Sequence, residues 1–335
     1  MGIINKSTQI TSAMDSDLVL DAGDFDIYGF GDLRVNLIIG DSGDNQMKGG
    51  LGNDTLYGGA GNDNLSGDVG DDYISGGAGD DLIKTGDGAD YVDGGADNDN
   101  IDAGIGDDSL FGGDGRDVIK AGVGNDFIEG GDDRDNIDGG AGNDTIDGGD
   151  GKDYIKGGDG NDVLNGGGSG RDYIDGGKGD DAISVQNDGL NPENVTLVGG
   201  DGNDTIMGGD GFDSISGGAG NDLINVTSGG DSISLGKGFD FIHLDYSALQ
   251  NGEDVSFSVV DFGVDDKLSF GHDFSGDFFL TGAGVTTAQT FDNLFIFDTT
   301  GNKLYFDEDG SRSEFDVVLL GSFNNYDLQA SQIVA

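Results

Sequence analysis

The sequence predicts an all-β protein whose main body is a parallel β-solenoid, and two observations carry this prediction. The first is a nine-residue repeat that runs from Gly40 to His243 in 21 units. The second is the composition of the unit, in which glycines dominate the first half and an aliphatic residue always takes the eighth position. A short repeat at a fixed period is typical of chains that stack one structural unit on the next.

Each unit divides into a turn and a strand. The residues Gly-Gly-x-Gly-x-Asp favour a turn, because glycine adopts positive φ without a steric penalty. The x-aliphatic-x triplet that follows favours a very short strand whose middle side chain points inward. Two units make one rung, and identical strands stack in parallel about 4.8 Å apart. About eleven rungs are expected, with a core of Ile, Leu and Val that is too thin to fold the chain alone.

The repeat defines three regions. Residues 1–39 alternate loosely between apolar and polar and are expected to form N-terminal capping strands. Residues 40–243 are the repeat region, with an insertion at 185–198 that holds Pro192, the only proline. Residues 244–335 have fewer glycines and more phenylalanines, and their alternating polarity predicts antiparallel hairpins that form a C-terminal cap.

The charge of the chain excludes several functions. Acidic residues outnumber basic ones 66 to 15, which gives a net charge of -51. Such a chain repels nucleic acid and acidic membrane surfaces, and no apolar run approaches the ~18 residues of a membrane span. The N-terminus lacks the apolar segment of a cleaved secretory signal. Without cysteine there is no disulfide and no thiolate zinc site. Because only 34% of the residues are hydrophobic, we expect folding to require something that neutralises the carboxylates.

The sixth position of the unit indicates which partner neutralises the carboxylates. It is Asp in every unit but the first, which has Asn45, and ordinary turn residues would not be fixed at one position in this way. Stacking places aspartates of successive rungs in columns along two turn edges, where bare carboxylates repel one another. Carboxylate and glycine carbonyl oxygens are hard donors that suit Ca²⁺, whereas softer metals prefer His or Cys. We expect about 16 calcium sites between successive loops. The predicted ligands are Asp54, Asp63, Asp72, Asp81, Asp90, Asp99, Asp108, Asp117, Asp126, Asp135, Asp144, Asp153, Asp162, Asp172, Asp181, Asp204, Asp213, Asp222, Asp231 and Asp240.

The motif over residues 40–243 closely resembles the calcium-binding repeat of the RTX, or haemolysin-type, family. The segments VVDFGVDDKLSF, LYFDEDG and LQASQIVA resemble the C-terminal part that follows RTX repeats. The resemblance implies a right-handed parallel β-roll and export by a type I secretion system that reads an uncleaved signal within residues 244–335. It also implies a protein that folds outside the cell, or at its surface, when it meets calcium. Metal binding to a site that is absent from the unfolded chain is folding free energy, so we expect the calcium-free chain to be disordered.

No separate catalytic domain is expected. Some RTX proteins join the repeats to a protease, lipase or epimerase domain, but this sequence has no HExxH and no GxSxG, and His243 and His272 are its only histidines. We therefore expect a non-catalytic calcium-binding protein. A solenoid enzyme that acts on uronate polymers is an alternative without a distinct acid–base cluster to support it. An ice-binding face would need columns of threonine, and only Thr55, Thr145 and Thr205 take the seventh position.

Two outward-facing rows leave open a second function, that of a polysaccharide-binding or adhesive module. Four of the fifteen basic residues take the fifth position on one turn edge: Arg116, Arg134, Lys152 and Arg171. Their spacing resembles that of sugars along an extended chain, which makes an extracellular polyuronate a candidate ligand. Local relief of acidic repulsion is the plainer explanation of this row. An outward aromatic row is expected to be covered by the chain itself or to bind a partner: Tyr57, Tyr73, Tyr91, Phe111 and Phe127.

Overall fold

The protein is all-β in every part that the structure describes. The computed structural model describes residues 18–19, 28–30, 37–185, 194–227, 229–244, 255–262, 266–270, 277–281, 294–298, 303–307, 317–323 and 333–334. All regular elements in these ranges are strands, and no helix occurs among them. The chain divides into two compact units, residues 1–177 and 178–335, and each is described by itself. The expected boundaries at residues 39/40 and 243/244 stay a prediction.

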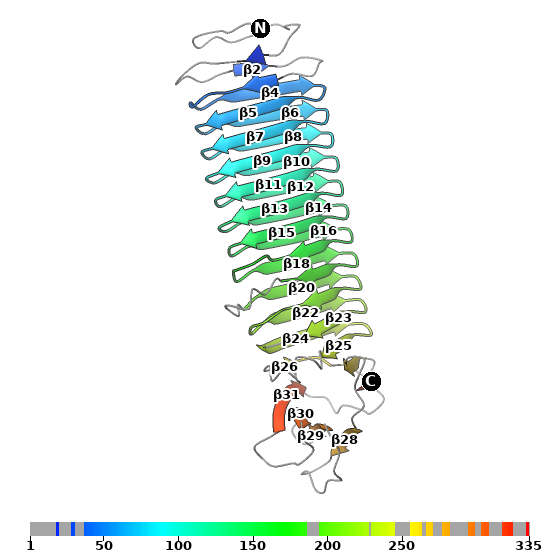
Figure 1. The fold of residues 1–335 in the computed structure, drawn as a ribbon. Helices are drawn as coiled ribbons and strands as arrows, with labels where there is room; N and C mark the ends of the chain where they lie inside the picture. Colours follow the sequence, from blue (N-terminus) through cyan, green and yellow to red (C-terminus); the bar gives the residue numbers. More distant parts are fainter. Residues whose placement is uncertain are drawn as a thin grey trace. The chain divides into compact units, whose positions relative to one another are not determined.

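In the first unit, strands of alternate repeats form two sheets, each with its strands stacked in parallel (Figure 1). One sheet contains β1 (Leu18–Val19), β3 (Leu37–Ile39), β5 (Thr55–Ala60), β7 (Tyr73–Ala78), β9 (Tyr91–Ala96), β11 (Ser109–Asp114), β13 (Phe127–Asp132), β15 (Thr145–Asp150) and β17 (Val163–Asn165). The other contains β2 (Tyr28–Phe30), β4 (Gln46–Leu51), β6 (Asn64–Val69), β8 (Leu82–Asp87), β10 (Asn100–Ile105), β12 (Val118–Val123), β14 (Asn136–Ala141), β16 (Tyr154–Asp159) and β18 (Tyr173–Lys178). The register is one rung, since Ile101 pairs with Ile83 before it and with Ile119 after it. The predicted parallel β-solenoid is confirmed.

Most strands are longer than the predicted triplet. They cover six residues and continue through the two glycines that begin the next unit, as β5 does. The register nevertheless skips the first of these glycines: Tyr57 pairs with Ser75 and Gly59 with Gly77, while Gly58 lies outside the paired positions. The first position of the unit therefore takes no part in the strand pairing, although it lies between paired residues.

The second unit contains two sheets of the same kind. One is formed by β19 (Ala182–Ser184), β21 (Thr205–Met207), β23 (Leu223–Val226), β25 (Phe241–Leu244), β27 (Lys267–Phe270) and β32 (Ile333–Val334). The other is formed by β20 (Thr196–Asp201), β22 (Ser214–Ala219), β24 (Gly229–Lys237), β26 (Val255–Val259), β31 (Val317–Phe323), β30 (Lys303–Asp307), β29 (Leu294–Asp298) and β28 (Asp277–Thr281). The prediction of antiparallel hairpins after residue 243 is confirmed for β29, β30 and β31. It is wrong for β26 and β27, which extend the parallel pairing of β24 and β25.

A single file of aliphatic side chains from each sheet forms the core. Every eighth-position side chain in the first unit is at most 1% exposed, from Met47 to Ile174. In the second unit the same position is at most 2% exposed, from Ile183 to Ile242. Successive members of a file pair directly, so each apolar side chain is covered by the rungs on either side of it. The inward direction predicted for this position is confirmed.

The structure also reveals two half-rungs that the motif does not mark. Thr196–Val198, the end of the predicted insertion, begins β20 and pairs with residues 214–216, with Leu197 buried. Beyond the predicted end of the repeats, Leu268 of β27 is buried and pairs with Ile242. Both segments lack the glycines of the motif, so only the apolar eighth position preserves the register.

Candidate metal sites at the turn edges

The sixth-position aspartates lie in the turns, directly before the strands, and are almost fully buried. All twenty predicted ligands are between 0% and 3% exposed. In the first unit they form two columns, one before the strands of each sheet. In the second unit one column contains Asp181, Asp204, Asp222 and Asp240, and the other contains Asp213 and Asp231. The structure thus places the predicted residues together in columns, while their role as ligands stays a prediction.

One oxygen of each carboxylate is held by the neighbouring rung. The backbone N–H of Asp90 donates to Asp108 Oδ1 at 2.8 Å, and that of Asp108 donates to Asp126 Oδ1 at 2.8 Å. Along both columns of the first unit this bond measures 2.7–2.9 Å. Hydrogen bonds from backbone N–H to a carboxylate are stronger than neutral ones, so they fix the rotamer of each aspartate.

The other oxygen is left without a donor. Among the described residues, no hydrogen-bond donor reaches the buried Oδ2 atom in these aspartates: Asp63, Asp72, Asp81, Asp90, Asp99, Asp108, Asp117, Asp126, Asp135, Asp144, Asp153, Asp204, Asp213, Asp222 and Asp240. Burying a carboxylate oxygen without a partner is strongly unfavourable. An array of such atoms therefore requires either protons or cations.

The first-position glycines give these oxygens room. A Cβ added to Gly58 would collide with Asp63 Oδ2 and with the carbonyl oxygen of Gly76, one rung further along. The same two kinds of oxygen face Gly76, Gly94, Gly112 and Gly130 in turn. The carboxylate of one loop and the carbonyl of the next therefore converge at each turn. On this edge the first-position glycines have no positive φ, so the space needed by the two oxygens explains why glycine stands there.

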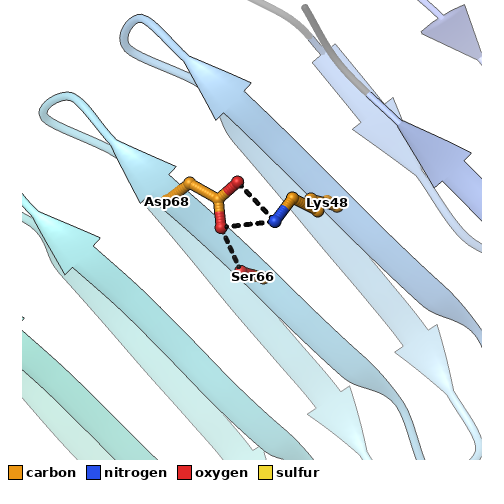
Figure 2. A network of polar contacts seen from close by, with 3 residues as sticks. All are labelled: Lys48, Ser66 and Asp68. Atoms are coloured by element: carbon orange, nitrogen blue, oxygen red, sulfur yellow. Dashed lines mark hydrogen bonds and ion pairs between the residues drawn. The ribbon is translucent and has the colours of Figure 1, made fainter.

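The second and fourth glycines are required by the backbone. Gly59 and Gly61 have φ of +112° and +101°, values that side chains disfavour. Asp68, at a second position, tolerates a φ of +79°. Figure 2 shows what compensates: Lys48 Nζ lies 2.7 Å from Asp68 Oδ2, and Ser66 Oγ donates to Asp68 Oδ1 at 2.9 Å. At Asp68 the backbone therefore keeps the positive φ of the second position without a glycine.

The two edges of the first unit differ at the first position. One edge has glycine throughout, whereas the other carries Thr85, Ala103 and Ala121 on three successive rungs. All three are buried, and Thr85 Oγ1 donates to the carbonyl of Ala103 at 2.7 Å. The Ala103 carbonyl is therefore already used by a hydroxyl, whereas the aspartates of these three loops keep an Oδ2 atom without a donor among the described residues.

Without a cation, burial raises the pKa values of the column. The pKa of Asp99 is raised to about 8, mainly by burial, against a lowering by the backbone hydrogen bond from Asp81 and with a smaller raising by the charges of Asp81 and Asp117. Burial likewise raises the pKa of Asp72 to about 7 and that of Asp222 to about 6. Loss of hydration is the largest cause in each case, because a buried charge has lost its water. The columns are acidic groups held in a place where their negative charge is disfavoured.

The donor set fits calcium. Within the described residues no group of three or more His, Cys, Asp or Glu side chains converges on one point, so a cation would take part of its coordination shell from backbone carbonyls. Carboxylate and carbonyl oxygens in flexible geometry match the six to eight oxygen ligands of Ca²⁺. In such a site the unpartnered Oδ2 atoms would supply the charge, and the loop carbonyls would supply the remaining donors.

The insertion does not interrupt the column that it was expected to break. Asp181 N–H donates to Asp204 Oδ1 at 2.9 Å although the two residues are 23 positions apart. On the other edge Val195 takes the place of an aspartate, and its N–H donates to Asp213 Oδ1 at 3.0 Å. The expected number of sites treats the insertion as a break and so omits the Asp181–Asp204 pair.

The fifth-position residues form a row outside each column. Asn62 accepts from Asp80 N–H at 3.2 Å, Asp80 accepts from Asn98 N–H at 3.0 Å, and Asn98 accepts from Arg116 N–H at 3.2 Å. The row then changes to Arg116, Arg134, Lys152 and Arg171, all exposed, whose side chains cannot accept. In the described part of the chain these four side chains form no ion pair.

The aromatic row lies on one sheet of the first unit. Neighbouring ring centroids are 5.1–5.9 Å apart from Tyr57 to Phe127, and the Tyr73 and Tyr91 rings are stacked within 3° of parallel. The other three neighbouring pairs are tilted by 37–53°, and Tyr57 and Tyr91 are each still 40% exposed.

One of three comparisons with known proteins, the match to a family model, agrees with this chemistry. The family model of the RTX calcium-binding nonapeptide repeat (4 copies) matches more than half of the chain, at residues 30–65, 39–74, 66–101, 93–128, 102–137, 129–164, 167–185 and 198–233. None of the curated proteins compared with the chain matches it. Among solved structures, the chain is similar to a hyperactive, Ca²⁺-dependent, β-helical antifreeze protein from an Antarctic bacterium, with 21% identity, 76% of this chain and 91% of that chain covered, and a TM-score of 0.35. The described residues contain no helix of the length and apolarity that crossing a membrane takes.

Proposed function

The chain belongs to the family of RTX calcium-binding nonapeptide-repeat proteins, and on that premise we propose that it is a secreted, non-catalytic protein that folds when calcium fills the gaps between stacked loops. The twenty buried aspartates are the ligands, together with carbonyl oxygens of the glycine turns. The observation that carries this proposal is the regular series of buried Oδ2 atoms without a hydrogen-bond donor. A purely structural role, acceptance of one backbone hydrogen bond by Oδ1, would not need the negative charge of a second buried oxygen.

Calcium, when bound, supplies the positive charge that two facing carboxylates lack. The residues of the chain orient the carboxylates, leave space for the oxygens and exclude water. The N–H of each sixth-position aspartate orients the carboxylate of the next rung, as in the pair Asp99 and Asp117. The first-position glycines leave space for the oxygens, and the aliphatic files exclude water behind them. Each rung thus completes a site only together with the next, so that binding and folding are one process.

Export and an extracellular or cell-surface location are part of this proposal. A chain of net charge -51 that stays unfolded without calcium is suited to passage through an exporter before it folds. The resemblance of residues 244–335 to RTX C-terminal segments supports a type I signal there. Co-expression with a type I exporter tests it: the full chain is expected in the medium, and a chain without residues 276–335 is expected to stay in the cell. Equal export of both would exclude a C-terminal signal.

Calcium-dependent folding is tested by circular dichroism and by calorimetric titration. The chelated chain is expected to be disordered at pH 7.5, and added Ca²⁺ is expected to produce β-structure that the same concentration of Mg²⁺ does not. Asp117→Asn removes one buried ligand and is expected to raise the calcium concentration at the folding midpoint. Asp114→Asn is the matched control, because Asp114 is an exposed residue of the same loop. A full β-spectrum in excess chelator would contradict the proposal.

A second candidate function, binding of a linear polyanion such as a polyuronate, is favoured by the basic row. Arg116, Arg134, Lys152 and Arg171 interrupt a series of hydrogen-bond acceptors with four cationic groups on successive loops of one edge. A negative polymer extended along that edge would meet one of them at each rung. In calcium, Arg116→Ala with Arg134→Ala is expected to weaken binding to a polyuronate at least tenfold. Lys84→Ala with Lys120→Ala changes the net charge equally at exposed sites elsewhere and is expected to have little effect. Equal loss in both pairs would show a general charge effect.

A further inference from the structure

We propose that the second unit holds a calcium site between Asp240 and Asp266, outside the glycine-rich repeats. This inference rests on the proposed function, since it assigns one more site of the same chemistry. Asp266 lies beyond the last predicted unit, and the family model matches nothing after residue 233. Its loop reads DFGVDD, without glycine at the first, second or fourth position.

The geometry around Asp266 repeats that of a motif aspartate. Asp240 N–H donates to Asp266 Oδ1 at 3.2 Å, as Asp222 N–H donates to Asp240 Oδ1 at 2.9 Å. Lys267 N–H donates to the Asp240 carbonyl at 2.7 Å, as Phe241 N–H does to the Asp222 carbonyl. Asp266 is 4% exposed. The chain therefore returns to the column with a carboxylate at the sixth position.

Asp240, the first residue of the pair with Asp266, also has a buried carboxylate oxygen without a hydrogen-bond donor among the described residues, which is the feature that indicates a cation at the motif sites. Asp240 is 1% exposed, and within the described residues its Oδ2 atom has no hydrogen-bond donor. Every gap between successive loops in this column is bounded by two carboxylates, and without Asp266 the column would end on an aspartate with a rung on only one side. Asp266 supplies the second carboxylate of that last gap.

The other edge of the same unit shows that the fold does not by itself place a carboxylate at the end of a column. There β26 follows β24 in the same parallel register, and the residue opposite Asp231 is Phe257, which is 4% exposed. An apolar side chain closes that column and offers no ligand. One edge thus ends in a phenylalanine and the other in a carboxylate.

Asp261 attaches the segment that carries the site. Its carboxylate accepts from Ser234 Oγ at 2.8 Å, from Leu235 N–H at 2.7 Å and from Gly236 N–H at 3.1 Å. Both oxygens of its side chain accept from the preceding rung, so the Asp261 carboxylate positions the segment. A cation between Asp240 and Asp266 would then make the attachment of residues 255–270 dependent on calcium.

The test is a count of bound calcium in the full chain, by native mass spectrometry, for Asp266→Asn. Asparagine keeps an oxygen that can accept from Asp240 N–H and removes the charge. One ion fewer per chain is expected, with faster amide hydrogen exchange in residues 255–270. Asp201→Asn, at an exposed turn position of the same unit, is expected to change neither measurement.

A second variant separates this inference from the proposed function. Asp222→Asn alters a motif aspartate of the same column and is expected to lower the calcium count as well. If Asp222→Asn loses calcium and Asp266→Asn binds as much as the unaltered chain, the added site is wrong and the motif sites stand. If neither variant loses calcium, both proposals fail. Should Asp266→Asn not fold, the calcium dependence of exchange in residues 255–270 of the unaltered chain decides: protection that is complete before the last ion binds would overturn the site.

Discussion

At the scale of single residues, the sixth-position aspartate and the first-position glycine form a functional pair. Oδ1 of Asp81 is bonded to the N–H of Asp63, and its Oδ2 lies against Gly76 and faces the carbonyl of Gly94. A side chain at Gly76 would occupy the place where these oxygens converge. In the proposed sites of this edge the aspartate would supply charge and the glycine would supply access.

Gly76→Ala is expected to weaken calcium binding and to destabilise the calcium-loaded protein by about 1–3 kcal/mol, the usual cost of an overpacked site. The cause is the added Cβ, which would displace Asp81 Oδ2 or the Gly94 carbonyl. Calorimetric titration and thermal unfolding in excess calcium measure the two effects. Ala78→Gly, which removes a methyl group from an exposed position of the same strand, is the control. An unchanged calcium affinity in Gly76→Ala would show that the convergence of oxygens has no part in binding.

At the scale of the element, each strand contributes one buried aliphatic side chain that is stacked between two others. Ile119 of β12 pairs with Ile101 on one side and Ile137 on the other, and it is fully buried. Since the solenoid has no thicker core, one truncation interrupts the file between two rungs.

Ile119→Ala is therefore expected to destabilise the calcium-loaded protein by about 2–5 kcal/mol, and Ile119→Val by about 0.5–1.5 kcal/mol, as for other buried aliphatic residues. Urea unfolding in saturating calcium measures the difference in the free energy of unfolding. Val123→Ala is the control in the same strand, because Val123 is 54% exposed. Equal effects at positions 119 and 123 would contradict the proposed core.

The elements also show how far the sequence can predict the structure. A residue type fixed every nine positions predicts the register, the inward side chain and the carboxylate columns, because each follows from periodicity. The half-rungs at Leu197 and Leu268 are missed, since they keep only one apolar residue and lose the glycines. Asp266 is missed for the same reason. The hydrogen bond from each Asp N–H to the next carboxylate is also beyond the motif, because it depends on how two rungs face each other.

At the scale of the whole molecule, the proposed function makes folding depend on the balance between carboxylates and cations. The 66 acidic residues include the buried columns, whose loss of hydration opposes folding as long as they are charged. Calcium is one way to neutralise them, and protons are another. These two ways differ in their dependence on pH.

In chelator, the folded form is expected to become less stable as pH rises. Burial raises the pKa of Asp99 to about 8, of Asp72 to about 7 and of Asp222 to about 6, from the ordinary aspartate value of 3.8. A carboxyl whose pKa is higher in the folded state binds more protons there, so its contribution to stability is complete below about pH 4 and is lost as pH rises through its folded pKa. Circular dichroism of the chelated chain is therefore expected to show more β-structure at pH 5 than at pH 8, and saturating calcium is expected to remove most of this difference. A chelated chain that gains structure toward pH 8 would have the opposite sign and would show that the buried columns do not oppose folding.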